Sequence, residues 1–166
     1  FTLPSQPKAN KPHELGFPFN IRFGLTFWKW LNFERGPYQP DPSKSAEWNR
    51  GAYLVKHVAH CGECHTPRDA FGGLKRGMFL AGAPDIEGGI APNVTPDEET
   101  GIGKWTEAQV IEVLKIGMLP DNDFVGGAMT DVVNHGTSFL TDEDLKAIAA
   151  YLKTVKPIKN KVEKKK

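Results

Sequence analysis

Cys61-Gly62-Glu63-Cys64-His65 contains both cysteines of this 166-residue chain. If the residues were shuffled, two cysteines three positions apart and followed by histidine would arise on the order of once in a few thousand arrangements. At the end of a helix, thiols with this spacing can reach the two vinyl groups of one haem, and the adjacent histidine can meet the iron from one face. The stretch therefore predicts one haem c, attached through Cys61 and Cys64, with His65 as an iron ligand.

Two other uses of closely spaced cysteines explain the stretch less well. A redox-active dithiol does not require the following histidine. A structural zinc site needs a fourth ligand at a regular spacing, and the other histidines, His13, His57, His60 and His135, form no second motif of this kind. Covalent haem attachment explains both cysteines and the histidine together.

A second iron ligand is expected, because an electron carrier changes charge without changing its coordination, and a methionine thioether raises the reduction potential relative to a second histidine. Met78 lies only 13 residues after the histidine of the motif, too near to leave chain for a loop and a helix around the haem. Met118 falls at the end of an expected helix, whose apolar face it would complete. We predict Met129, because the preceding Gly126-Gly127-Ala128 lets the backbone approach closely. Met118 and His135 are the alternatives.

Three helices are expected around this site. The first is predicted over residues 46–59, immediately before the motif, from a helix-start signal followed by apolar residues at helical spacing. A capping box at Thr106 begins a second helix that runs to about Ile116. The third is capped by Thr141 and ended by Pro157. Long glycine-rich loops, no clear strand and no repeat complete the pattern of a small all-α domain.

Two flanking segments are distinguished from this domain, which we place at residues 45–156. Residues 1–44 hold seven prolines and a dense series of aromatic residues, with room for one short helix between Asn20 and Asn32. We expect an arm that packs on the domain's own surface, or else a docking surface for another subunit or a membrane face. Residues 157–166 are rich in lysine and predict a solvated tail.

Charge and hydropathy exclude several classes of function. Residues 1–152 carry 14 basic and 19 acidic side chains, and an acidic body argues against nucleic acid as a partner. No stretch approaches the ~20 apolar residues of a transmembrane helix, and the first residues do not form a signal peptide. We expect a soluble protein without a transmembrane segment, whose export signal, if it had one, has been removed.

Five stretches together resemble a known family. The chain is similar to the class I cytochromes c, and in particular to the haem domains in cytochrome subunits of bacterial periplasmic alcohol, gluconate and aldehyde dehydrogenases. The resemblance covers about residues 45–156. It rests on Arg50-Gly51-Ala52-Tyr53-Leu54-Val55, Cys64-His65-Thr66-Pro67-Arg68, Ala91-Pro92-Asn93-Val94-Thr95-Pro96-Asp97, Thr100-Gly101-Ile102-Gly103-Lys104-Trp105 and Asp144-Leu145-Lys146-Ala147-Ile148-Ala149-Ala150-Tyr151-Leu152.

The resemblance implies a role for each matching position. Cys61 and Cys64 would form the thioether bonds, His65 would be the proximal iron ligand and Met129 the distal one. The Pro92 carbonyl would accept a hydrogen bond from His65. Asn93, Thr95 and Trp105 would lie near the haem edge or its propionates, although Trp105 is equally explained as an aromatic residue packed in the core.

The resemblance also implies a biological setting. Haem is attached to reduced cysteine pairs outside the cytoplasm, so the protein is expected in the periplasm. It would accept single electrons from a dehydrogenase and pass them to another cytochrome or a terminal oxidase, without catalysing a reaction itself.

Two other arrangements remain open. Phe17-Pro18-Phe19-Asn20-Ile21-Arg22 resembles the linker between haem domains of multi-haem members. The chain is therefore expected to be either a single-haem relative that keeps this linker or the last domain of a longer protein. If the arm is an interface, the chain is instead a subunit bound permanently to one enzyme. A haem enzyme or gas sensor with an open iron site is the remaining alternative, but no accompanying set of catalytic histidine, arginine and acidic residues is present.

Overall fold

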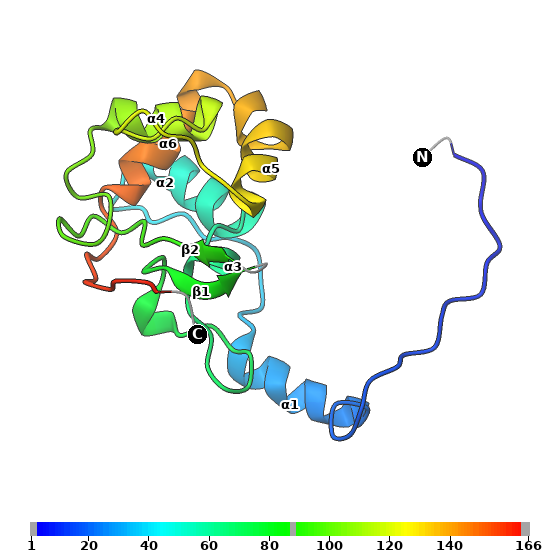
Figure 1. The fold of residues 1–166 in the computed structure, drawn as a ribbon. Coiled ribbons are helices and arrows are strands. Elements are labelled where there is room, and N and C mark those ends of the chain that lie inside the picture. The colour runs from blue at the N-terminus through cyan, green and yellow to red at the C-terminus, as the bar shows by residue number, and fades with distance from the viewer. Residues whose placement is uncertain (1–2, 87–88, 164–166) are drawn as a thin grey trace. The chain divides into compact units, whose positions relative to one another are not determined.

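Six α-helices and one short β-hairpin form the regular structure of residues 3–86 and 89–163, which are the residues that the computed structural model describes (Figure 1). This arrangement confirms the predicted all-α class. The hairpin lies inside the predicted loop after the motif and was not expected, because its sequence lacks the apolar alternation of a half-buried strand. The elements are α1 (Arg22–Asn32), α2 (Ala46–Tyr53), α3 (Gly62–His65), β1 (Ala83–Ile86), β2 (Gly89–Ala91), α4 (Glu107–Ile116), α5 (Ala128–His135) and α6 (Asp142–Leu152).

The chain divides into two compact units, Phe1–Gly36 and Pro37–Lys166. Residues 37–44, which their prolines had assigned to the arm, are held in the second unit by Asn49 of α2. The Tyr38 hydroxyl donates to the Asn49 carbonyl oxygen at 3.1 Å, and the Asn49 amide donates to the Asp41 carbonyl oxygen at 2.8 Å. Together with the packing of the Tyr38 ring on Tyr53 and His57, these bonds join the segment to the domain that carries the cysteine motif.

Helix α2 ends earlier than the sequence predicts and continues as a π-helical turn, Leu54–Val58. The Ala59 amide donates to the Leu54 carbonyl at 2.8 Å, and the Cys61 amide donates to the Val55 carbonyl at 3.0 Å. His60 then takes a positive φ of 37°, a conformation that few residues other than glycine adopt. A wider turn of this kind is common near functional sites, and here it delivers the chain to the first cysteine of the motif.

The predicted caps of the last helices are present. The Thr106 hydroxyl accepts from the Gln109 amide, and the Gln109 side chain accepts from the Thr106 amide, as the capping box requires. The Thr141 hydroxyl accepts from the Asp144 amide at 3.2 Å. Helix α6 ends at Leu152, before the proline that had been expected to stop it. The turn is made by Thr154, whose hydroxyl donates to the Tyr151 carbonyl at 2.8 Å.

Helices α2 and α6 make the closest helix-to-helix contact of the second unit. A Cβ atom placed on Gly51 of α2 would lie 1.9 Å from the carbonyl oxygen of Ala147 in α6. Trp48 and Tyr151 pack edge to face across the same contact, with ring centroids 5.1 Å apart. The absence of a side chain on Gly51 is what allows the two backbones to approach.

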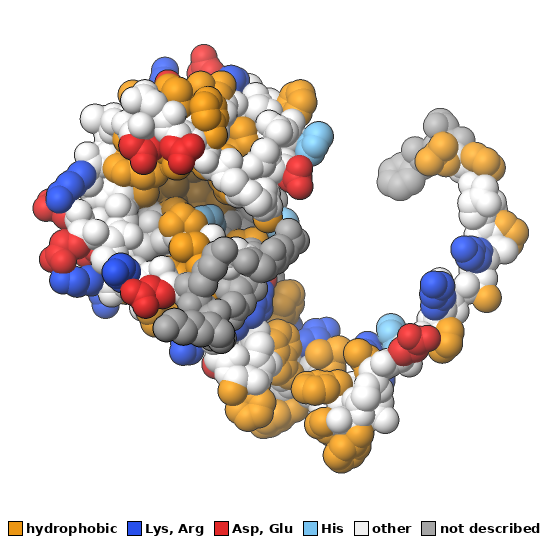
Figure 2. Space-filling model, viewed as in Figure 1, with side chains coloured by type: hydrophobic (Ala, Val, Ile, Leu, Met, Phe, Trp, Pro, Cys, Tyr) orange, Lys and Arg blue, Asp and Glu red, His pale blue; other side chains and the backbone are white. Residues whose placement is uncertain are grey.

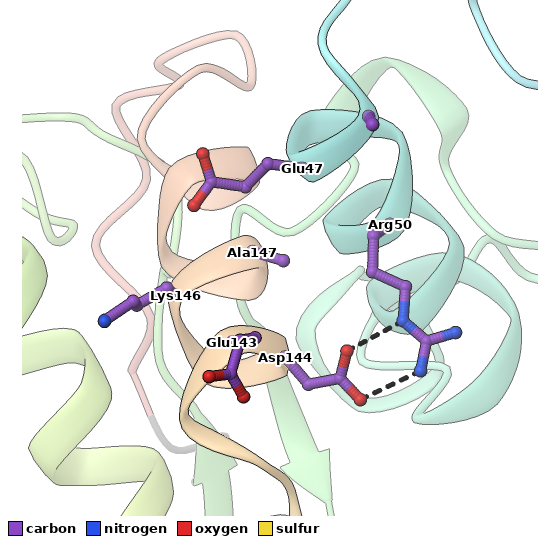
Figure 3. A pocket seen from close by; sticks show the side chains of 7 residues that line it. Glu47, Arg50, Glu143, Asp144, Lys146 and Ala147 are labelled. Atoms are coloured by element: carbon purple, nitrogen blue, oxygen red, sulfur yellow. Dashed lines mark hydrogen bonds and ion pairs between the residues drawn. The ribbon is translucent and has the colours of Figure 1, made fainter.

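An ion pair bridges the two helices beside this contact (Figure 3). Arg50 donates from Nε and Nη2 to the two carboxylate oxygens of Asp144 at 2.7 and 2.8 Å. These hydrogen bonds lower the pKa of Asp144 and raise that of Arg50. The pair borders a surface groove lined by Ala46, Glu47, Arg50, Glu143, Asp144, Lys146 and Ala147.

The hydrophobic core lies between α2, α4 and α6. Its members are buried apolar residues from these helices, from the π-helical turn after α2 and from the loops on either side of the hairpin: Ala52, Leu54, Val55, Leu80, Ile102, Val110, Leu114, Leu145, Ile148, Ala149, Tyr151 and Leu152. Leu80 and Ile102 come from the long loops, so the core also anchors the segments that follow the cysteine motif.

Replacing Gly51 with alanine is expected to lower the free energy of unfolding by about 2 kcal/mol, because the new methyl group forces α2 away from α6. Chemical denaturation of the purified protein measures the change. Gly77→Ala is the matched control, since a Cβ atom at Gly77 meets nothing within 4 Å. Equal stability of the two variants would contradict the close helix contact.

Candidate haem-binding site

The two cysteines lie on one turn of helix. Cys61 immediately precedes α3 and Cys64 lies within it, and the His65 amide donates to the Cys61 carbonyl at 2.9 Å. Both thiols are free, Cys61 half-buried and Cys64 exposed. Because residues three apart in a helical turn share a face, both sulfur atoms are available to one planar group.

Burial opposes ionisation of the first thiol. It raises the pKa of Cys61 to about 11, with a smaller contribution from the neighbouring Cys64. A redox-active dithiol or a zinc thiolate depends on a lowered pKa and an electropositive surrounding. The environment of Cys61 is therefore unlike that of a redox-active dithiol.

His65 is oriented by a carbonyl group far along the chain. Its Nδ1 atom lies 2.8 Å from the carbonyl oxygen of Pro92, which is the contact that the family resemblance implied. Since a carbonyl oxygen can only accept, Nδ1 must carry the proton, and the lone pair of Nε2 is free to bind a metal. Burial lowers the pKa of His65, partly offset by the hydrogen bond to Pro92. The lowered pKa suits a neutral imidazole ligand, and the hydrogen bond fixes which ring nitrogen keeps the proton.

Gly82 allows the Pro92 loop to approach the motif. Its amide donates to the His65 carbonyl at 2.6 Å. A Cβ atom on Gly82 would lie 2.7 Å from the Asn93 nitrogen and 2.8 Å from the Pro92 carbonyl carbon, and its φ of +87° also favours glycine. The chain after the motif and the loop carrying the acceptor are thus in direct backbone contact.

Asn93 and Thr95, which the resemblance places near the haem edge or its propionates, form hydrogen bonds with protein groups. Both are buried, at 3% and 0% exposure. The Asn93 amide donates to Thr100 Oγ1 and to the Ile158 carbonyl, while its oxygen accepts from the amide and hydroxyl of Thr95. These protein partners occupy the hydrogen-bonding capacity of Asn93, which leaves none for a haem propionate. We assign the pair to holding the loop.

Met129 lies in the first turn of α5, a helix that the sequence analysis did not identify. The helix is short, and it begins after Gly127, at a φ of +58°, without a side-chain cap, so the usual start signal is missing. The Met129 side chain is half-buried and packs against the hydrophobic core, as Cys61 does. The candidate distal ligand and the first cysteine therefore border the same core.

The other candidate ligands belong to different segments of the chain. Met118 follows α4 and pairs through its backbone with Phe124. Met78 ends a short 3-10 turn, and His135 is the exposed last residue of α5. Trp105 is half-buried against the core, which is the packing role given as its alternative.

The residues of this region fit a covalently attached haem. Two free thiols on one turn match a pair of vinyl groups, and an imidazole with an unprotonated Nε2 follows directly. Figure 2 shows that the surface of the second unit is hollowed, with hydrophobic and histidine side chains visible inside the hollow. Among residues 3–86 and 89–163, no three His, Cys, Asp or Glu side chains gather in a way that could hold a bare metal ion.

Comparison with known proteins decides the family. The family model described as cytochrome c matches residues 48–156. The chain belongs to the cytochrome c family. Membership confirms the predicted family and indicates haem c as its cofactor. For the matched residues 48–156, it confirms the prediction of an electron-transfer domain.

Several curated cytochromes c match nearly the whole chain. A diheme cytochrome c-type of Cereibacter sphaeroides is 46% identical over 95% of this chain and 51% of its own length. The fructose dehydrogenase cytochrome subunit of Gluconobacter japonicus is 41% identical over 86% of this chain and 29% of its own length. The cytochrome c subunit of alcohol dehydrogenase (quinone) from Gluconobacter oxydans is 37% identical over 88% of this chain and 32% of its own length. The chain thus spans about half or less of these cytochromes.

In the described part of the chain, no helix has the length and apolar character required to cross a bilayer.

Proposed function

We propose that this chain carries single electrons through one haem c, attached at Cys61 and Cys64 and bound by His65 and Met129. The observation that carries the proposal is the hydrogen bond between His65 Nδ1 and the Pro92 carbonyl, because it fixes the tautomer that binds iron one residue after the free thiol of Cys64. When bound, haem c supplies an iron centre that gains and loses one electron at a time.

Each residue has a definite task in this proposal. Cys61 and Cys64 hold the group on a unit whose small core could not enclose it fully. His65 donates through Nε2 and is kept in position by Pro92. Met129 occupies the remaining coordination position with a neutral thioether, which excludes water and other ligands and favours the reduced state. The protein needs no acid or base in this function, and none is assigned.

The proposed setting is the periplasm, because haem is attached to reduced cysteine pairs outside the cytoplasm. The relatives include cytochrome subunits of fructose and quinone-type alcohol dehydrogenases. This supports a dehydrogenase as the electron donor. We propose another cytochrome or a terminal oxidase as the acceptor.

Met129→Ala is expected to retain covalent haem but to open the iron to external ligands, because the side chain that fills the sixth position is gone. Carbon monoxide binding to the reduced protein and cyanide binding to the oxidised protein measure this, by absorption spectroscopy. Met118→Ala is the matched control and should exclude both ligands as the unmodified protein does. Ligand exclusion retained in Met129→Ala and lost in Met118→Ala would reverse the assignment of the distal ligand.

A second arrangement, a subunit bound permanently to one dehydrogenase, is favoured by helix α1. Phe23, Phe27, Trp30 and Leu31 recur at the spacing of one helix face and are 83%, 62%, 74% and 54% exposed. The helix buries none of its residues and contains no acidic side chain. An apolar face of this size is typical of a protein interface.

The two arrangements differ in the size at which the haem-containing protein elutes from a periplasmic extract of its own source. A permanent subunit elutes well above the mass of its own haem-containing polypeptide, measured on a denaturing gel, and a Phe23→Ser, Phe27→Ser, Trp30→Ser variant returns it to that mass. Phe139→Ser is the control, because Phe139 is 79% exposed on the other unit. Elution of the unmodified protein at the mass of its own polypeptide would show a mobile carrier.

A further inference from the structure

The segment from Ile158 to Val162, called here the C-terminal segment, is bound to the domain and is not the solvated tail that its lysines predict. Ile158, Asn160 and Val162 are half-buried, whereas Lys159 and Lys161 are exposed. This alternation is that of an extended chain with one face packed. The lysines dominate the composition, but the residues between them make the contacts.

The first anchor of the C-terminal segment consists of Asn93 and Thr95. Both follow Pro92, whose carbonyl accepts the hydrogen bond from His65. The Ile158 carbonyl accepts from the Asn93 amide group at 2.7 Å, and the Ile158 amide donates to Thr95 Oγ1 at 3.2 Å. Asn93 is the residue that follows Pro92 in the chain. Both backbone groups of Ile158 are thus committed to the loop that carries the Pro92 carbonyl.

The second anchor lies on the chain that follows the cysteine motif. The Asn160 side chain donates to the Ala81 carbonyl at 2.8 Å, and its backbone amide donates to Thr100 Oγ1 at 2.9 Å. Ala81 precedes Gly82, whose amide holds the His65 carbonyl. A Cβ atom on Gly82 would lie 2.6 Å from a methyl group of Val162. The C-terminal segment therefore closes over the point where the motif and the Pro92 loop meet.

We propose that the C-terminal segment positions the Pro92 carbonyl against His65 and so sets how strongly His65 donates to iron. The proposal rests on the proposed function, in which His65 is the iron ligand. Hydrogen-bond partners of a ligating histidine fix its ring and raise its basicity. Asn160 is accordingly a positioning residue. Its side chain holds Ala81, next to Gly82, and Gly82 contacts both the Pro92 loop and the His65 carbonyl, so Asn160 acts on the iron without touching it.

Asn160→Ala tests the proposal in the haem-loaded protein. Loosening the loop weakens the His65 hydrogen bond, and a less basic ligand stabilises oxidised iron less, so the reduction potential rises. The His65 ring proton, followed by NMR in the reduced state, should exchange about fivefold faster, which is the effect of losing one ordinary hydrogen bond. A redox titration and hydrogen exchange measure the two effects.

Two variants separate positioning from general stability. Lys161→Ala alters an exposed side chain of the same segment and should match the unmodified protein in potential and ring-proton exchange. Gly51→Ala destabilises the helix contact and should leave the potential unchanged. Val162→Ala, which uncovers Gly82 with less disturbance, should change both readouts in the direction of Asn160→Ala and replaces it if that variant does not fold.

The outcomes distinguish this proposal from the proposed function. An unchanged potential and unchanged ring-proton exchange in Asn160→Ala, or in Val162→Ala if it is used instead, overturn the positioning role while His65 remains the ligand. Equal shifts in Gly51→Ala overturn it as well, because they trace the effect to global stability. A spectrum of the unmodified protein without histidine-coordinated haem overturns the proposed function itself.

Discussion

The hydrogen bond between His65 and the Pro92 carbonyl is the constraint on which the rest of the site depends. It joins two segments that lie 27 residues apart, at 2.8 Å. Without it, the ring could rotate about its side-chain bonds, and either nitrogen could carry the proton. With it, the histidine that follows Cys64 presents one defined lone pair. The glycine contact at Gly82 and the buried Asn93 and Thr95 all serve to hold this carbonyl in place.

The helices form the packed body to which the motif is attached. Gly51 lets α2 pack closely on α6, and the π-helical turn after α2 then leads the chain into the motif. On the other side, Leu80 and Ile102 fix the long loop to the same core. The cysteines, the histidine and its acceptor are therefore all anchored to one packed unit, as a cofactor site requires when the group is attached at one edge.

The sequence indicated the features that depend on local chemistry. The spacing of the cysteine motif, the capping box at Thr106 and the cap at Thr141 each involve residues close together in the chain, and the structure contains both caps. Features that depend on tertiary contacts could not be predicted from the sequence. The apolar residues of the π-helical turn have the spacing of an α-helix, and α5 lacks a side-chain cap. Asn160 is flanked by lysines, so the composition of its segment gave no sign that it packs on the domain. Asn93 shows the same limit, because its family position suggested the haem and could not indicate its hydrogen bonds to Thr95, Thr100 and Ile158.

The visible and near-infrared spectra of the purified protein, oxidised and reduced, together with its intact mass, test the central claim most directly. The account predicts the added mass of one haem, the sharp reduced bands of a c-type cytochrome, and a near-infrared charge-transfer band from methionine to ferric iron. A mass without haem would contradict covalent attachment. A high-spin ferric spectrum would contradict the closed His65 and Met129 coordination and point to a ligand-binding haem protein.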